Sequence, residues 1–161
     1  MFYLMGTRRF LPASILERHR DFGRFWNAPV QIDEPYPDGV LACALYQHMV
    51  AFTVLGHLDS QTDPRRALED LAHRLRVSPG WLLRKFHGQA SASLAEMAEW
   101  LIELELEAPS FETAIAAAIR ANPYDRDLVA VSAEDVSPEE LERVRAERLE
   151  MLARVKEELR E

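Results

Sequence analysis

The sequence predicts a mostly α-helical protein with two short, closely spaced helices near its centre and a long amphipathic helix at its C-terminal end. Apolar residues recur at helical spacing in several segments, and Ser or Asp followed by Pro stands where helices would begin. With 161 residues, 48% hydrophobic and 29% charged, the chain is long enough for one core and too apolar for a disordered protein. We therefore expect one helical domain with appendages.

Residues 1–61 are expected to form an N-terminal helical supporting region. A helix is predicted from Ser14 to Trp26 because apolar residues stand near helical spacing, namely Ile15, Phe22 and Phe25. A loop should follow, because prolines interrupt any regular element at positions 29, 35 and 37. At the start of the chain, apolar residues precede the positive ones, which is the reverse of a secretory signal, so we expect a cytoplasmic protein.

The apolar stretch from Gly39 to Leu58 is predicted to be a buried helix because of its length and alanine content. Residues 40–45 and 50–55 would also suit two strands, and the sequence leaves both structures open. Polar residues interrupt the stretch, so we expect a core element and no membrane span: Gln47, His48 and His57. Cys43 is the only cysteine; it excludes an intramolecular disulfide and is expected to be a small core side chain.

Residues 62–121 carry the two closely spaced helices. Asp63 and Pro64 predict the start of the first, and residues 65–76 show apolar side chains on one face: Leu68, Leu71, Ala72 and Leu75. Ser78 is a suitable N-cap and Pro79 a suitable first residue for the second helix, which Gly88 should end. A capping box, Ser93 with Glu96, predicts a helix to about Glu107, and another is expected from Ser110 to Ala121.

The two helices joined by a short turn follow the helix-turn-helix plan, in which small Ala72 lets the second helix pack closely on the first. Residues 71–88 read LAHRLRVSPGWLLRKFHG, and residues 93–101 read SLAEMAEWL. This segment resembles the lambda-repressor-like, or XRE, family of helix-turn-helix DNA-binding proteins over about residues 64–107. The resemblance implies that the second helix enters the major groove of double-stranded DNA.

The segment departs from the pattern of that family at several positions. Arg76 stands where the family usually has a glycine in the turn, and Leu68 stands where it often has a glutamine that contacts phosphate. The base-reading positions fall on Pro79, Gly80 and Trp81, of which the first two carry no side-chain donor. Direct reading of bases should therefore be poor.

This segment still contains several residues that are suited to contact phosphate groups. The residues expected to contact DNA are Ser78, Pro79, Gly80, Trp81, Arg84, Lys85, His87, Arg74 and Arg76, with Arg65 and Arg66 widening the positive surface. Residues 62–90 hold six basic and three acidic side chains and are the only net-basic part of a chain whose net charge is -8. The alternatives are a helix-turn-helix used only for protein contact and a plain solvated surface.

Other chemistries find less support in the sequence. The histidines at 48, 57, 73 and 87 form no metal-binding spacing, and the glutamates between 96 and 107 suit a solvated helix face better than a catalytic pair. Apolar neighbours would raise the pKa of the Cys43 thiol, which disfavours a nucleophile. We expect no enzyme, metal or cofactor. Core packing is expected for five of six aromatic residues, namely Phe22, Phe25, Trp26, Phe86 and Trp100, with Trp81 exposed.

Residues 122–161 are expected to form a linker and a C-terminal amphipathic helix that starts at Ser137-Pro138 with a capping box. An apolar stripe along it is assigned to dimerisation: Leu141, Val144, Leu152, Val155 and Leu159. The same stripe would also suit packing on the chain's own core. The sequence as a whole predicts a transcriptional regulator acting as a homodimer; the alternative is an antitoxin-like or phage-packaging adaptor that keeps the fold and reads little DNA sequence.

Overall fold

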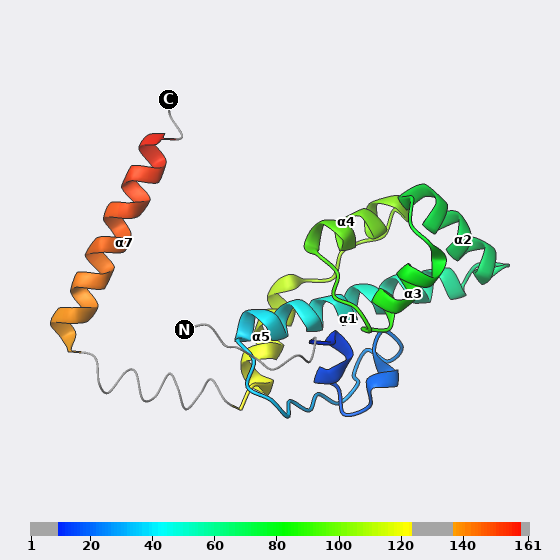
Figure 1. Ribbon diagram of the computed structural model, residues 1–161, viewed down its shortest axis with the longest axis horizontal. Helices are drawn as coiled ribbons and strands as arrows, with labels where there is room; N and C mark the ends of the chain where they lie inside the picture. Colours follow the sequence, from blue (N-terminus) through cyan, green and yellow to red (C-terminus); the bar gives the residue numbers. More distant parts are fainter. Residues whose placement is uncertain (1–9, 124–136, 159–161) are drawn as a thin grey trace. The chain divides into compact units, whose positions relative to one another are not determined.

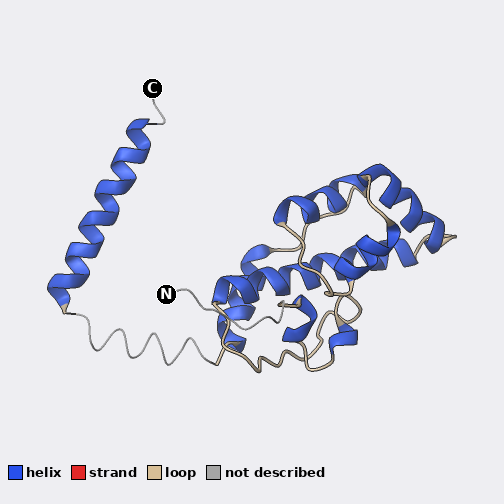
Figure 2. Ribbon diagram, in the orientation of Figure 1, coloured by secondary structure: helices blue, strands red, loops and turns tan. Residues whose placement is uncertain are grey.

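The computed structural model describes residues 10–123 and 137–158, which are mostly helical and contain no β-strand (Figure 1). Two compact units divide the chain at residue 125. In the first, two short 3-10 helices precede five α-helices, and loops connect them (Figure 2). The 3-10 helices are η1 (Pro12–Ile15) and η2 (His19–Asp21); the α-helices are α1 (Asp38–Asp59), α2 (Pro64–Leu75), α3 (Pro79–Phe86), α4 (Leu94–Glu103) and α5 (Phe111–Ala121).

Helix α1 is the central element of the first unit. It packs against each of the other four α-helices and η1 and runs toward the end that carries α2 in Figure 1. The structure thus confirms a helix over 39–58 and excludes the two strands. By length and hydropathy α1 is able to cross a membrane, but 61% of its most apolar window is buried within the fold, as in the core helix of a globular domain.

Two buried polar residues on α1 connect it to other segments. Gln47 donates from Nε2 to the carbonyl oxygens of Lys85 (2.7 Å) and Ala90 (2.9 Å), and its Oε1 accepts from the N–H of Ala92 (2.9 Å). His48 accepts at Nδ1 from the N–H of Gly23 (2.8 Å). These bonds join α1 to both ends of the loop that follows α3 and to the segment after η2.

The starts of α2, α3, α4 and α5 were predicted correctly. The side chains of Asp63, Ser78 and Ser110 each accept from a backbone N–H three residues on, and Ser93 forms the full capping box with Glu96. The predicted end of α4 was wrong by four residues. Glu105 has φ +54°, and the N–H of Leu106 donates to the Leu101 carbonyl oxygen (2.9 Å), which closes the helix after Glu103.

The predicted helix from Ser14 to Trp26 is wrong. Instead the chain runs through η1 and η2 and pairs with the loop after them: Glu17 N–H donates to the Pro29 carbonyl (2.9 Å), and Gln31 N–H donates to the Ile15 carbonyl (2.8 Å). Backbone hydrogen bonds across the loop therefore replace those of a helix.

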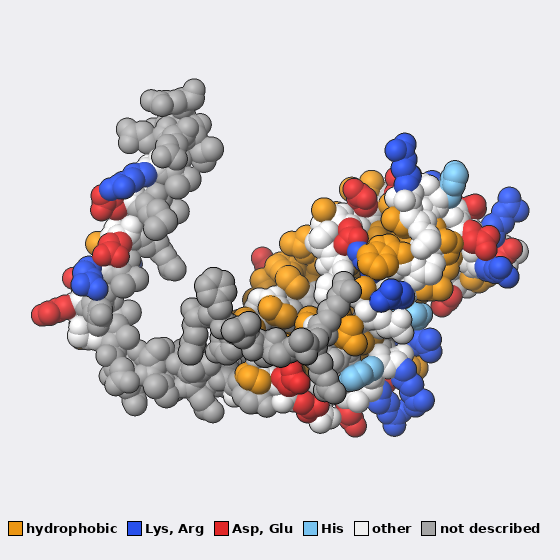
Figure 3. Space-filling view, in the orientation of Figure 1, with side chains coloured by type: hydrophobic (Ala, Val, Ile, Leu, Met, Phe, Trp, Pro, Cys, Tyr) orange, Lys and Arg blue, Asp and Glu red, His pale blue; other side chains and the backbone are white. Residues whose placement is uncertain are grey.

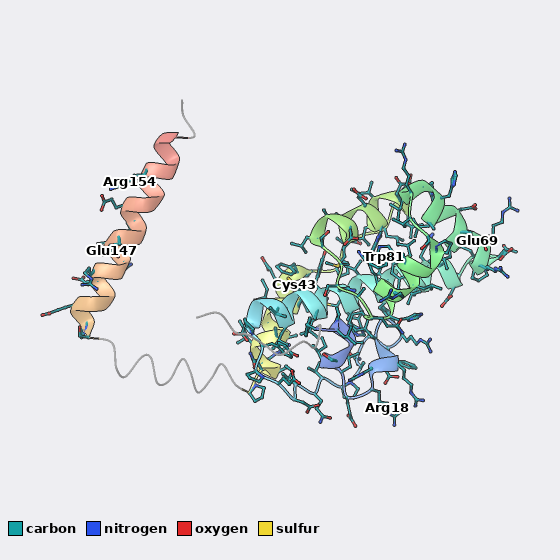
Figure 4. All side chains as sticks on the ribbon, viewed as in Figure 1. Arg18, Cys43, Glu69, Trp81, Glu147 and Arg154 are labelled. Carbon is teal, nitrogen blue, oxygen red and sulfur yellow. The ribbon has the colours of Figure 1, made fainter. Side chains whose placement is uncertain are left out.

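Two predictions about burial also fail. Phe25 is 61% exposed and Trp26 45% exposed, whereas Phe22, Phe86 and Trp100 are buried as expected. Cys43 is exposed, because α1 turns Leu41, Ala42, Ala44 and Leu45 toward the core and leaves Cys43 facing solvent (Figure 4).

Helix α7 (Pro138–Glu158) belongs to the second unit. Its described side chains are exposed and include the ion pairs Arg143–Glu147 (4.0 Å) and Arg154–Glu150 (2.8 Å). Of the residues assigned to dimerisation, Leu159 lies outside the described residues, and the side chains of the others also lie outside what the structure describes: Leu141, Val144, Leu152 and Val155.

Candidate nucleic-acid interface

Residues 76–78 connect α2 to α3. Arg76, which stands where the resemblance implies a glycine, takes the left-handed conformation, with φ +57° and ψ +40°. Its N–H donates to the carbonyl oxygens of Ala72 and His73, and the N–H of Val77 donates to that of Ala72 (3.0 Å). These bonds satisfy the last carbonyls of α2, and buried Leu71 and Ala72 face the core beside α3.

Helix α3 has a buried side and a solvent side. Leu82, Lys85 and Phe86 are buried, and the ring of Phe86 packs edge-on against Trp100 with centroids 4.9 Å apart. At 100° per residue, the opposite side of the helix carries Gly80, Arg84 and His87. Gly80 and Arg84 are exposed, so this side is the part of α3 that can meet a ligand.

The N-terminal turn of α3 leaves one backbone donor unused among the described residues. Pro79 has no N–H, the N–H of Trp81 donates to Ser78 Oγ (3.2 Å), and the N–H of Leu82 donates to the Ser78 carbonyl oxygen (3.2 Å). The Ser78 hydroxyl is therefore an acceptor in the cap, and the N–H of Gly80 is the donor available to an anion.

Lys85 does not lie where the sequence placed it. It was expected outside the core as a phosphate contact, but it is only 4% exposed and forms an ion pair with Glu96 of α4. Its Nζ also lies 4.7 Å from the centroid of the Trp81 ring. Burial raises the pKa of Glu96, but the hydrogen bonds and charge of Lys85 and the Ser93 N–H outweigh that effect and lower it. Lys85 thus fastens α3 to α4.

The arginines expected at DNA separate into two groups. Arg74 donates from Nη1 to the Glu103 carbonyl oxygen (3.1 Å) and lies 3.5 Å from the Glu103 carboxylate, so it joins α2 to α4. Arg65 pairs with Glu69 at 3.1 Å. Arg66, Arg76 and Arg84 are exposed, and no carboxylate in the described part of the chain lies within 4.0 Å of them.

Two further residues that were expected to contact DNA, Trp81 and His87, are influenced by charged side chains close to them. Trp81 is 36% exposed, and the Arg84 guanidinium lies 5.7 Å from its ring centroid, so Lys85 and Arg84 both position the indole. His87 is half-buried; burial and then the charge of Arg24 lower its pKa, and a hydrogen bond with the Phe22 carbonyl opposes them. The lowered pKa disfavours the charged form of His87, so this side chain is a weaker source of positive charge than the arginines.

Lys and Arg side chains gather at the end of the first unit that carries α2, α3 and the segment of η2 (Figure 3). No contact with DNA was expected from the arginines of residues 18–24: Arg18, Arg20 and Arg24. Arg18 points outward from this segment in Figure 4. Their positive charge was visible in the sequence, but nothing in its periodicity showed that the segment packs beside α3.

Among residues 10–123 and 137–158, no three His, Cys, Asp or Glu side chains come together as metal ligands. Comparison with known proteins found no matching protein family, no matching curated protein and no matching solved structure.

Proposed function

We propose that the protein is a DNA-binding transcriptional regulator in the cytoplasm, that α2 and α3 act as a helix-turn-helix, and that it binds as a homodimer. The single observation that carries the proposal is the solvent side of α3. It combines the available N–H of Gly80 with the exposed guanidinium of Arg84, which has no carboxylate partner among the described residues, and Arg76 lies in the adjoining turn. Backbone N–H groups and arginines are the donors that contact DNA phosphates.

Sequence selectivity should be modest under this proposal. Pro79 and Gly80 offer no side-chain donor at the start of α3, and the ring of Trp81 is held by two cations. The exposed edge of Trp81 supports an apolar contact with a thymine methyl group, which distinguishes fewer base pairs than a bidentate hydrogen bond. Affinity would then come mainly from phosphates.

A specific observation also favours the second candidate, a protein-interaction adaptor. Helices α4 and α5 expose large apolar side chains that no described residue covers, namely Leu94 (52%), Ile102 (71%), Ile115 (39%) and Ile119 (51%). Leu94 and Ile102 border a hollow lined also by Tyr46 and Leu106. Exposed apolar surface of this kind is typical of protein contacts.

The test is the binding of the full chain to a fluorescent duplex of random sequence across a range of salt concentrations. We expect Arg84→Glu to weaken binding at least tenfold at low salt, because it places a carboxylate against phosphates. The fold should persist, since the Arg84 side chain is exposed. Wild-type affinity should fall with salt at a logarithmic slope of about -0.9 for each phosphate contacted.

Arg120→Glu provides a control with the same change of charge on the exposed surface of α5. It should bind as the wild type does. If the wild-type chain shifts no duplex at low salt, or if both variants bind equally well, the regulator proposal fails and the adaptor becomes the better candidate.

A further inference from the structure

We infer that the segment of residues 18–24, through Arg20 and Arg24, is a second contact with the phosphate backbone of duplex DNA, beside the contact made by α3. This inference rests on the proposed function and deepens it, because it assigns part of the DNA surface to a segment outside the helix-turn-helix. Three properties of the segment carry it: its position, its rigidity and its unpaired cations.

The segment packs on the C-terminal end of α3. Phe22 packs closely on the chain where α3 ends, because a Cβ at Gly88 would stand 2.8 Å from the Phe22 ring. A hollow at this place is lined by Gly23 and Arg24, by Leu83 of α3 and its C-cap His87, and by residues of α1 such as Phe52 and Asp59. Because His87 lies on the solvent side of α3 together with Gly80 and Arg84, Arg24 borders the surface that would meet DNA.

The backbone of the segment is held at several points. Phe22 is fully buried, and the N–H of Gly23 donates to His48 of α1. Gly23 has φ +73°, and a Cβ there would stand 2.6 Å from the Phe86 carbonyl oxygen, so the chain approaches α3 as closely as only glycine permits. A held backbone loses little conformational freedom on binding, which favours its use as a contact.

The arginine side chains of the segment are accessible to an anionic ligand. Arg18, Arg20 and Arg24 are exposed, and no carboxylate among the described residues lies within 4.0 Å of their guanidinium groups. Acidic side chains do occur nearby, since Glu17 and Asp21 belong to the segment and Asp59 lines the hollow. Figure 3 shows the basic side chains continuing from α2 and α3 over this segment.

The ligand that fits this arrangement is a phosphodiester strand. A helix in the major groove is bordered by phosphates, so cations on an element beside the helix meet the backbone and not the bases. The contact would then be independent of sequence and would add to the salt dependence of binding.

The test compares the full-length wild type with Arg20→Gln/Arg24→Gln in binding to one random-sequence duplex at several salt concentrations. We expect the logarithmic salt slope to become shallower by up to about 1.8, since each lost phosphate contact removes about 0.9. The charge-preserving variant Arg20→Lys/Arg24→Lys should keep the wild-type slope. Arg84→Gln should lower the slope separately, and the control Arg120→Gln should leave it unchanged.

The outcomes separate this inference from the proposed function. If Arg84→Gln lowers the slope but Arg20→Gln/Arg24→Gln behaves as the wild type, α3 binds DNA and the second contact is wrong. If Arg20→Gln/Arg24→Gln and Arg120→Gln lower it equally, the effect is one of overall charge and the inference is also wrong. If the wild-type chain binds no duplex, the proposed function and this inference both fail. Thermal melts show that each variant is folded.

Discussion

Two neighbouring polar side chains on α1 explain how the segments around α3 are held. Gln47 uses both its amide nitrogen and its amide oxygen on backbone groups of residues 85–92, and it is only 2% exposed. A buried amide that lost these partners would leave several backbone groups unsatisfied, each at a cost of about 1–3 kcal/mol. The polar interruptions of the apolar stretch at Gln47 and His48 are therefore part of the core.

His48 predicts how the stability of the fold depends on pH. Burial lowers the pKa of His48 below its usual 6.5, and the backbone carbonyls of Trp26 and Phe25 oppose this to a smaller extent. The unfolded chain therefore binds a proton more readily than the folded chain at this site. The contribution of His48 to the free energy of unfolding should be fully present above about pH 6.5, and it should be lost as the pH drops below that value. The lowered pKa of His87 acts in the same direction.

The measurement is the free energy of unfolding in urea at pH 7.5 and pH 5.0. His48→Gln keeps an acceptor near the N–H of Gly23 but cannot take up a proton, so it should lose less stability between the two pH values than the wild type. His73→Gln changes an exposed histidine of α2 and should behave as the wild type does. An equal loss in all three proteins would contradict the assignment to His48.

At the scale of the elements, Lys85 and Glu96 join α3 to α4. Lys85→Glu should destabilise the fold toward the lower end of the range of about 3–5 kcal/mol for breaking a buried ion pair, because the Glu96 side chain is 38% exposed. It would set two carboxylates together and remove the cation beside Trp81. Arg84→Glu, one residue earlier and exposed, should leave the melting temperature almost unchanged.

The reversed pair Lys85→Glu/Glu96→Lys is the control for this prediction. It should recover part of the lost stability, since it restores opposite charges between the helices, although it gives up the capping box that Glu96 completes with Ser93. If Lys85→Glu melts at the same temperature as Arg84→Glu, the ion pair contributes nothing to the packing of α3 on α4.

The elements also show what the sequence could predict. Helix starts were predicted because one side chain and its local spacing determine a cap, as Ser78 and Ser93 do. The structure of the segment from Ser14 to Trp26 was predicted wrongly, because it depends on backbone pairing with the loop at Pro29 and Val30. Such pairing leaves no helical or strand periodicity in the sequence. The burial of Lys85 was missed for a related reason: its partner, Glu96, belongs to another helix.

For the candidate site, too, local features could be predicted from the sequence and contacts between distant segments could not. Arg76 lies in the turn before α3 and Arg84 is exposed, and both features follow from local sequence, whereas their contact with DNA stays a prediction. The position of Arg24 beside His87 depends on contacts across more than sixty residues of chain, which a single sequence does not display.

At the scale of the whole molecule, the two compact units lead to a prediction about assembly. The core of the first unit is built from η1, α1 and the helices up to α5, with Ala114 and Ala118 of α5 fully buried. Helix α7 belongs to the second unit and carries the apolar residues that the sequence assigns to dimerisation. We expect that a chain truncated after Glu134 keeps the cooperative melt of the first unit.

The same truncated chain should sediment as a monomer and bind duplex DNA more weakly, because joining two DNA-binding units raises the apparent affinity by about 10²–10⁴ when both reach their sites. Sedimentation velocity, thermal melting and duplex binding of the truncated and full-length chains check the three parts together. Loss of the cooperative melt would show that residues 135–161 stabilise the first unit in the same chain. A full-length chain that already sediments as a monomer would contradict the dimer and leave a single unit to bind DNA.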